Sequence, residues 1–171
     1  MSIEPTVSRF EGARIRFDSP LGFDRVLERL RAAITALPLA EFNKAVAASN
    51  GQEAFEAAMG RCVGASGFML FGEIDHGAWI AKYGIRRRAL RWIFGNPLIA
   101  ITMLRHDLQA GLFVPIELLL LETEDQRRCN VTYVRPSSLI AINQEPELLA
   151  AAQALDAKAH AYVAAAVCAE D

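Results

Sequence analysis

The sequence predicts an α+β domain, and two stretches near its middle carry that prediction. Residues 89–94 alternate in polarity as a strand does, and the turn Gly95-Asn96-Pro97 follows them. Asn96 suits a helix N-cap and Pro97 suits the first helical position, so a helix is expected to run to about residue 105. Residues 114–123 carry apolar side chains on both faces of an expected strand, which indicates a central position in a sheet.

Composition and charge limit the class of protein. The chain has 171 residues, of which 53% are apolar and 22% charged, so one globular domain spanning residues 1–171 is expected. A net charge of −2 argues against a nucleic-acid partner. The first residues have neither a basic region nor an apolar signal core, and no apolar run approaches the ~20 residues that span a bilayer. We therefore expect a cytoplasmic protein without membrane contact, whose widely spaced cysteines stay reduced.

The N-terminal part of the chain predicts extended structure followed by a helix. Residues 6–10 and 13–17 form either two short strands around Glu11-Gly12 or one long bulged strand. Apolar residues with three-and-four spacing then predict a helix over 23–34.

Residues 39–66 show helical spacing twice, on either side of a short polar break. They predict a helical pair that either covers the core or lines a cleft. Asn50 and Glu53 resemble a capping pair, which supports a fresh helix start at that point.

The second half of the chain alternates strands and helices. In order, the expected elements are a strand at 68–71, a brief helix at 75–83, the strands at 89–94 and 114–123, and a hairpin return at 128–134. A last helix is expected at about 145–168, with apolar residues spaced four and three apart. Several of these residues are alanines, which let a neighbouring backbone approach closely.

Several short motifs and single residues follow one another between residues 73 and 139: Ile74-Asp75-His76, Phe94-Gly95-Asn96-Pro97, Asp107, Phe113-Val114-Pro115, Tyr133 and Pro136. In this ordered combination the chain resembles the bacterial and archaeal domain-of-unknown-function family numbered 302. The first strand and helix, to about residue 34, resemble that family more loosely.

The resemblance implies a mixed, mostly antiparallel sheet of about five to six strands with helices packed mainly on one face, often in a homodimer. It implies no biochemical role, since none is established for the family. Residues 67–140 are then the family-like core, 39–66 an added helical pair, and about 145–168 a C-terminal helix. Leu98 and Glu117 stand where many members carry basic residues, which removes positive charge near the turn.

Five residues are candidates for a ligand-binding site: Asp75, His76, Asn96, Glu117 and Tyr133. His76 beside Asp75 suits a proton-transfer group or a ligand contact. The alternative is structural: Asp75 caps the helix, and His76 bonds a backbone carbonyl. Asn96 lies where free helix N–H groups gather, which suits an anion unless its own side chain satisfies those groups.

The other two candidates lie on expected strands. Glu117 sits among leucines, so it faces solvent, pairs with a cation such as Arg91 or Arg135, or titrates in a cavity. Tyr133 places its hydroxyl in the same cavity or packs in the core with that hydroxyl satisfied.

Other polar clusters give weaker indications. Arg86-Arg87-Arg88 with Arg91, near Trp92, forms a basic cluster that either contacts nucleic acid or an acidic partner, or lies on a solvated rim. The three histidines are never four residues apart, so no metal and no cofactor is expected.

These observations favour a homodimeric domain that binds a small molecule or a partner without catalysis. The apolar surplus predicts a pocket between sheet and helices, rimmed by Asp75, His76, Asn96 and Tyr133, with residues 39–66 as a lid. One alternative is an enzyme that uses His76 and Glu117 as acid and base, which requires them within ~6–10 Å of each other. Another is an interaction module whose central strand or last helix forms a subunit interface.

Overall fold

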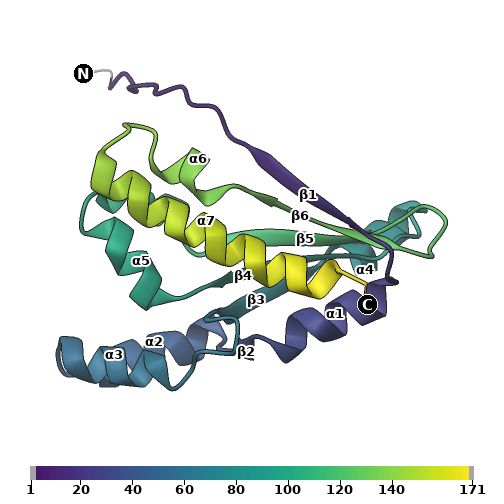
Figure 1. The fold of residues 1–171 in the computed structure, drawn as a ribbon, viewed down its shortest axis with the longest axis horizontal. Helices are drawn as coiled ribbons and strands as arrows, with labels where there is room; N and C mark the ends of the chain where they lie inside the picture. Colours follow the sequence, from purple (N-terminus) through teal and green to yellow (C-terminus); the bar gives the residue numbers. More distant parts are fainter. Residues whose placement is uncertain (1–2, 170–171) are drawn as a thin grey trace.

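A six-stranded sheet forms the centre of the fold in the computed structural model, which describes residues 3–169 (Figure 1). The strands are β1 Arg14–Ser19, β2 Thr35–Ala36, β3 Met69–Asp75, β4 Ala89–Gly95, β5 Ile116–Glu122 and β6 Cys129–Val134. Their order is β1-β6-β5-β4-β3-β2, and every pairing is antiparallel except the parallel β2–β3 pair. The predicted mixed, mostly antiparallel α+β fold is therefore confirmed.

The helices lie across one face of this sheet and around one end of it (Figure 1). They are α1 Phe23–Ala32, α2 Leu39–Ala48, α3 Gln52–Gly60, α4 His76–Ile80, α5 Pro97–Leu104, α6 Pro136–Ile140 and α7 Pro146–Val167, with 3-10 turns at Ala81–Tyr83 and Leu108–Leu112. Among residues 3–169, no helix is both long enough and apolar enough to cross a bilayer.

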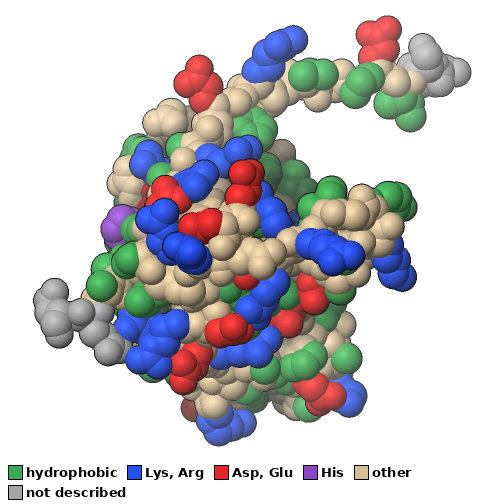
Figure 2. Space-filling model, turned by 90° about the vertical axis from the view of Figure 1, so that its right-hand side faces the viewer, with side chains coloured by type: hydrophobic (Ala, Val, Ile, Leu, Met, Phe, Trp, Pro, Cys, Tyr) green, Lys and Arg blue, Asp and Glu red, His purple; other side chains and the backbone are tan. Residues whose placement is uncertain are grey.

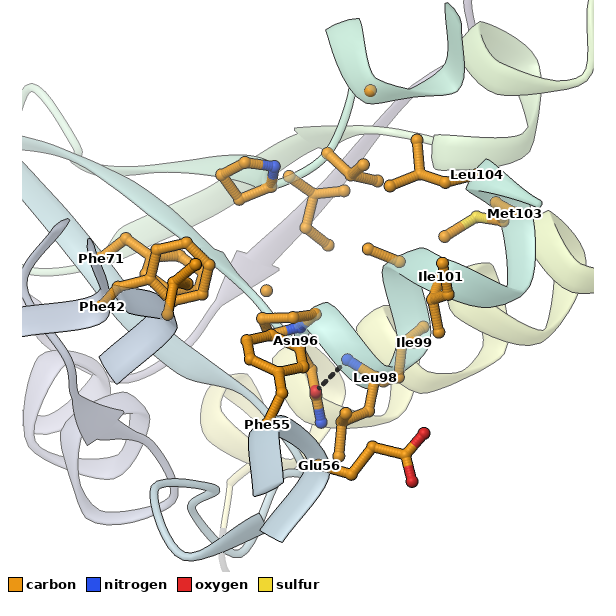
Figure 3. Close-up of a pocket in the computed structure, with 18 of the residues that line it drawn as sticks. Phe42, Phe55, Glu56, Phe71, Asn96, Leu98, Ile99, Ile101, Met103 and Leu104 are labelled. Atoms are coloured by element: carbon orange, nitrogen blue, oxygen red, sulfur yellow. Dashed lines mark hydrogen bonds between the residues drawn. The ribbon is translucent and has the colours of Figure 1, made fainter. Parts of the chain in front are cut away.

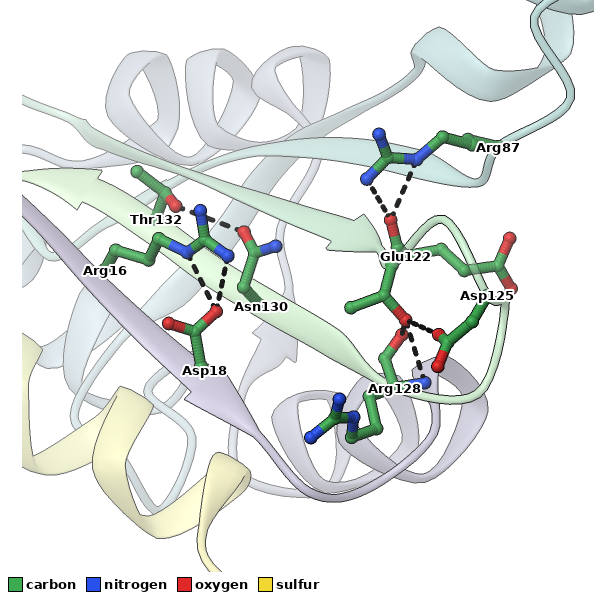
Figure 4. Close-up of polar contacts among 9 residues, drawn as sticks. Arg16, Asp18, Arg87, Glu122, Asp125, Arg128, Asn130 and Thr132 are labelled. Carbon is green, nitrogen blue, oxygen red and sulfur yellow. Dashed lines mark hydrogen bonds and ion pairs between the residues drawn. The ribbon is translucent and has the colours of Figure 1, made fainter.

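The strands bury one face and leave the other partly open. In β5, Leu118 and Leu120 are buried beneath α1 and α7, whereas Leu119 and Leu121 on the other side are only half-buried. Two ion pairs, Arg91–Glu117 and Arg16–Asp18, lie on that second face, which we call the open face. Figure 4 shows the pair between Arg16 and Asp18. Helices thus cover mainly one face of the sheet, as predicted, while α2 and α3 cover the β3 end of the open face, where Met69 is buried beside Met59.

Helix α7 packs closely on the sheet because its buried stripe contains small residues. Ala152, Ala159 and Ala166 are buried in the main core together with Tyr162. The Tyr162 hydroxyl donates a hydrogen bond of 2.9 Å to the Leu30 carbonyl oxygen, which ties α7 to α1. Burial raises the pKa of this phenol, so it stays a donor at neutral pH.

Some expectations for the N-terminal half were wrong. Residues 6–10 form no strand, because β1 pairs only with β6 and that pairing begins at Arg14 opposite Val134. The short strand expected at 68–71 continues to Asp75, because β4 offers a partner that far. Asn50 caps nothing, since α3 begins after Gly51 in the left-handed region, with φ 91°. The two-residue strand β2 was not predicted. The expectation of no signal segment used the first residues of the chain, of which Met1 and Ser2 lie outside the described residues.

Adjacent leucines on β5 test the one-sided burial. Leu118→Ala is expected to lower the free energy of unfolding by about 2–5 kcal/mol, because it leaves a cavity under α1 and α7. Leu119→Ala is expected to cost less than half as much, because that side chain keeps contact with water. Urea unfolding of both variants measures the difference, and equal costs would contradict the one-sided burial of β5.

Candidate functional site

The turn between β4 and α5 is held by the side chain of Asn96. Its Oδ1 accepts a hydrogen bond of 2.8 Å from the Leu98 N–H, and Pro97 occupies the first helical turn. Its Nδ2 donates a bond of 3.0 Å to the Gly67 carbonyl oxygen, just before β3. The predicted N-cap is confirmed, and the second bond fixes where α5 begins relative to β3.

Gly95 lets the chain pass close to the segment that enters β5. A Cβ at this position would lie only 3.2 Å from the Pro115 Cβ and 3.6 Å from the Phe71 ring. This close approach explains why glycine precedes the cap.

Helices α2 and α3 pack beside the same end of the sheet through a second, smaller core. Its buried members are Leu37, Met59 and Met69. Phe42 of α2 contacts Phe71 of β3 edge to face, with ring centroids 5.5 Å apart. The β3–β4 register shifts between Leu70 and Gly72, so Phe71 is the extra residue of a bulge. A bulge re-aims its side chain, and here the ring meets α2 (Figure 3).

Between this helical pair and α5 lies an apolar groove with a volume of about 1240 Å³. Its walls come from α2, α3, α5 and the adjoining ends of β3, β4 and β5 (Figure 3). The apolar residues that dominate it include Leu39, Phe42, Val46, Phe55, Phe71, Ile93, Leu98, Ile99, Ile101 and Leu104. This volume is above the ~300–1,000 Å³ typical of small-molecule sites.

Most polar side chains in the groove already have partners. The Ser49 hydroxyl donates to the Ala45 carbonyl oxygen at 2.7 Å, and Gln52 donates to the Glu56 carboxylate at 2.8 Å. Asn96 is engaged by the two bonds described above. The groove therefore offers apolar surface with few polar groups left to orient a ligand.

The structure does not bring the five predicted site residues together. Asn96 lines the groove, but Asp75 and His76 lie at the opposite end of β4: Met69 pairs with Gly95, whereas Asp75 pairs with Leu90. Asp75 caps α4 by accepting from the Ala78 N–H at 2.9 Å, and His76 Nδ1 accepts from the Trp79 indole at 3.1 Å. The expectation of one shared concavity is therefore wrong, because β3 and β4 are antiparallel neighbours and the end of β3 lies beside the start of β4.

Glu117 and Tyr133 lie on opposite faces of the sheet. Glu117 is on the open face and pairs with Arg91 through two hydrogen bonds, one of the partners expected for it. Tyr133 is buried on the helix-covered face, beside a small second cavity that Asp156 and His160 also line. Burial, and then the charge of Asp156, raise the pKa of Tyr133, so its hydroxyl stays protonated.

The geometry separates the residues of the acid–base alternative. Asp75, which precedes His76, pairs with Leu90, whereas Glu117 pairs with Ile93, three residues along β4. At ~3.4 Å per residue and ~4.8 Å per strand, the Asp75 and Glu117 backbones lie roughly 14 Å apart. Neither His76 nor Glu117 lines the groove.

The basic cluster is largely engaged by nearby acceptors. Arg88 forms a two-bond ion pair with Asp24, and this hydrogen bonding lowers the pKa of that carboxyl. Arg87 donates to the Glu122 carbonyl oxygen, beside the hairpin that Asp125 braces (Figure 4). Figure 2 shows basic and acidic side chains interspersed at this end of the molecule. The interpretation as a solvated rim fits this arrangement.

One group of side chains bears on the prediction that no metal is held. Potential ligand atoms of His106, Glu145 and Glu147 lie within 4.8 Å of one another. His106 pairs with Glu147 at 3.3 Å, and both carboxylate oxygens of Glu145 cap α7. The group is thus accounted for by helix capping and an ion pair, and the absence of a metal stays a prediction.

Sequence reasoning missed the aromatic wall of the groove. The helical spacing of Phe42 and Phe55 was visible, and a cleft was one of the two roles considered for residues 39–66. That Phe42 would contact Phe71, and that Phe55 would line the same groove, depended on the bulge in β3 and on where α5 starts, which are set by tertiary contacts.

Comparisons with known proteins agree with this architecture. The fold is similar to a solved structure described as an uncharacterized conserved protein DUF302 from Bacillus stearothermophilus, with a TM-score of 0.62. The match covers 90% of this chain and 97% of that protein. The sequence identity is 15%, so this similarity shows the fold alone. No curated protein matched the chain.

The fold defines an α+β domain whose helices cover mainly one face of the sheet, with an apolar groove at one end of it. The family model for the domain of unknown function DUF302 matches residues 43–166, well over half of the sequence. The chain belongs to this family. The match includes most of the helical pair at 39–66 and extends through nearly all of α7.

Two substitutions at Asn96 separate its hydrogen bonds. Asn96→Ala removes both and is expected to lower the free energy of unfolding by about 1–2 kcal/mol. Asn96→Asp keeps the acceptor for the Leu98 N–H and loses only the donor to Gly67, so it is expected to cost less. Urea unfolding gives both values, and an alanine variant as stable as the wild type would show that the cap does not hold α5.

Proposed function

We propose that this domain binds an apolar small molecule in the groove between α2, α3 and α5. One observation carries the proposal: α5 is apolar around almost its whole circumference, yet only Met103 in it is buried. A helix that is apolar on all sides normally lies inside a protein. Here Ile101 keeps 45% of its surface exposed, and across the groove Leu39 and Val46 keep 59% and 43%. A bound apolar molecule would cover this surface.

The lining also supports binding in preference to catalysis. The charged side chains among the lining residues are Glu56 and Arg105, and no histidine or cysteine is among them. The buried thiol of Cys129 lies elsewhere, and burial raises its pKa to about 11, which keeps it unreactive at neutral pH. We retain a cytoplasmic setting in the proposal, which the free thiols of Cys62, Cys129 and Cys168 support.

A series of straight-chain alcohols tests the groove. Each added methylene contributes about 0.8 kcal/mol of transfer free energy when it leaves water, so affinity is expected to rise about fourfold per methylene until the groove is full. Ala100→Trp would fill the α5 side of the groove and abolish this binding. Ala154→Trp, on the exposed side of α7, is the matched control and is expected to bind as the wild type does.

Calorimetric titration measures the affinity of each variant for each alcohol, and thermal shift measures the stabilisation that binding gives. A ligand present at 100 times its Kd would add about 2.7 kcal/mol to the stability of the wild type. If no alcohol binds, or if Ala100→Trp binds as tightly as Ala154→Trp, the groove is not the site.

The open face of the sheet supports a second part of the proposal, a homodimer. Half-buried Leu119 and Leu121 lie there beside the Arg91–Glu117 ion pair. A two-fold related copy would meet the same surface, and opposite charges would then face each other. Helix α7, the other interface expected, has its apolar stripe buried in the core.

Light scattering tests this dimer. Leu119→Glu is expected to convert a dimer to a monomer, whereas Leu108→Glu, on an exposed turn away from that face, leaves it dimeric. A wild-type chain that is monomeric at all concentrations contradicts the proposal.

A further inference from the structure

We propose that the ligand of the groove is a long-chain monocarboxylate, with its tail against the aromatic wall and its carboxylate at Arg105. This inference rests on the proposed function and goes beyond it by naming the chemical class of the ligand. It follows from a difference in chemistry between the two ends of the groove.

One end of the groove is aromatic. Phe42, Phe55 and Phe71 gather there, beside the start of α5 (Figure 3). The polar groups nearest to them, on Ser49, Gln52 and Asn96, are engaged within the protein. A charged head group placed at this end would lose its water without gaining a partner, which is costly. The aromatic end therefore suits a hydrocarbon tail.

The other end of the groove carries a cation. Helix α5 forms one wall, and the lining continues from Leu98 to Arg105. Seven residues of helix span about 10 Å at ~1.5 Å per residue, so the groove is elongated. An extended chain lying along α5 would bring its head group to Arg105.

The Arg105 side chain has spare hydrogen-bonding capacity. Its Nε donates a long bond of 3.3 Å to the Ile101 carbonyl oxygen in the same helix, and it forms no ion pair with a residue in the described range 3–169. A guanidinium stays charged at any physiological pH and matches a carboxylate with two parallel N–H donors.

Neighbouring charges do not compete strongly for this position. Glu147 pairs with His106, and Asp107 caps the following turn by accepting from the Gln109 N–H at 2.8 Å. Glu56, the other charged lining residue, accepts from Gln52 and points away from the groove in Figure 3. Arg105 is thus the cation that the groove offers to an anionic head group.

Three ligands with the same tail and different head groups test the inference: dodecanoate, dodecanol and dodecylammonium, each below its aggregation concentration. Calorimetric titration of the wild type is expected to give the tightest binding for dodecanoate, about fivefold tighter than dodecanol, and the weakest for dodecylammonium. Arg105→Gln is expected to remove the advantage of dodecanoate while leaving dodecanol binding unchanged. Arg105→Lys keeps the charge but not the two-donor geometry, so it should retain part of the advantage.

Arg86→Gln is the matched control, because Arg86 is an exposed arginine that does not line the groove. It is expected to bind all three ligands as the wild type does. If dodecanol binds as tightly as dodecanoate, or if Arg105→Gln weakens both equally, the assignment of Arg105 is overturned while the apolar groove stands. If none of the three ligands binds, the proposed function fails together with the inference.

Discussion

The position of α5 depends on the side chain of Asn96, and the groove depends on the position of α5. The Asn96 side-chain oxygen accepts a hydrogen bond from the Leu98 N–H at the start of the helix, and its side-chain nitrogen donates one to the Gly67 carbonyl oxygen. The first bond makes the chain turn into a helix directly after β4, and the second ties that turn to the loop before β3. Helices α2 and α3 also pack on β3, so both walls of the groove are positioned by contacts with the same strand or with the loop before it.

Much of the fold was predictable because it follows from local chemistry. Asn96-Pro97 marks a helix start by its hydrogen bonding and fixed backbone angle, and the spacing along α7 marks one buried stripe. The two-sided apolar character of residues 114–123 correctly placed β5 inside the sheet. Each of these features can be predicted from residues that are close together in the sequence.

The site was less predictable because it depends on contacts between distant segments. Asp75 and Asn96 flank neighbouring strands, and the antiparallel register alone sends them to opposite ends of β4. The bulge that aims Phe71 at Phe42 leaves no clear mark in the sequence. Arg105 was read only as the approximate end of a helix, since its role depends on the groove beside it. The family brings the fold but no assigned activity, so the groove has to be judged by its own chemistry.

The most direct test of the account is to locate a bound ligand by NMR, with isotope-labelled methyl groups in the isoleucines, leucines and valines. Dodecanol added to the protein is predicted to show magnetisation transfer to Leu98, Ile99 and Ile101 along α5. Transfer confined to Leu119 and Leu121 on the open face would show that the apolar molecule binds the sheet, and would contradict the groove as the functional site.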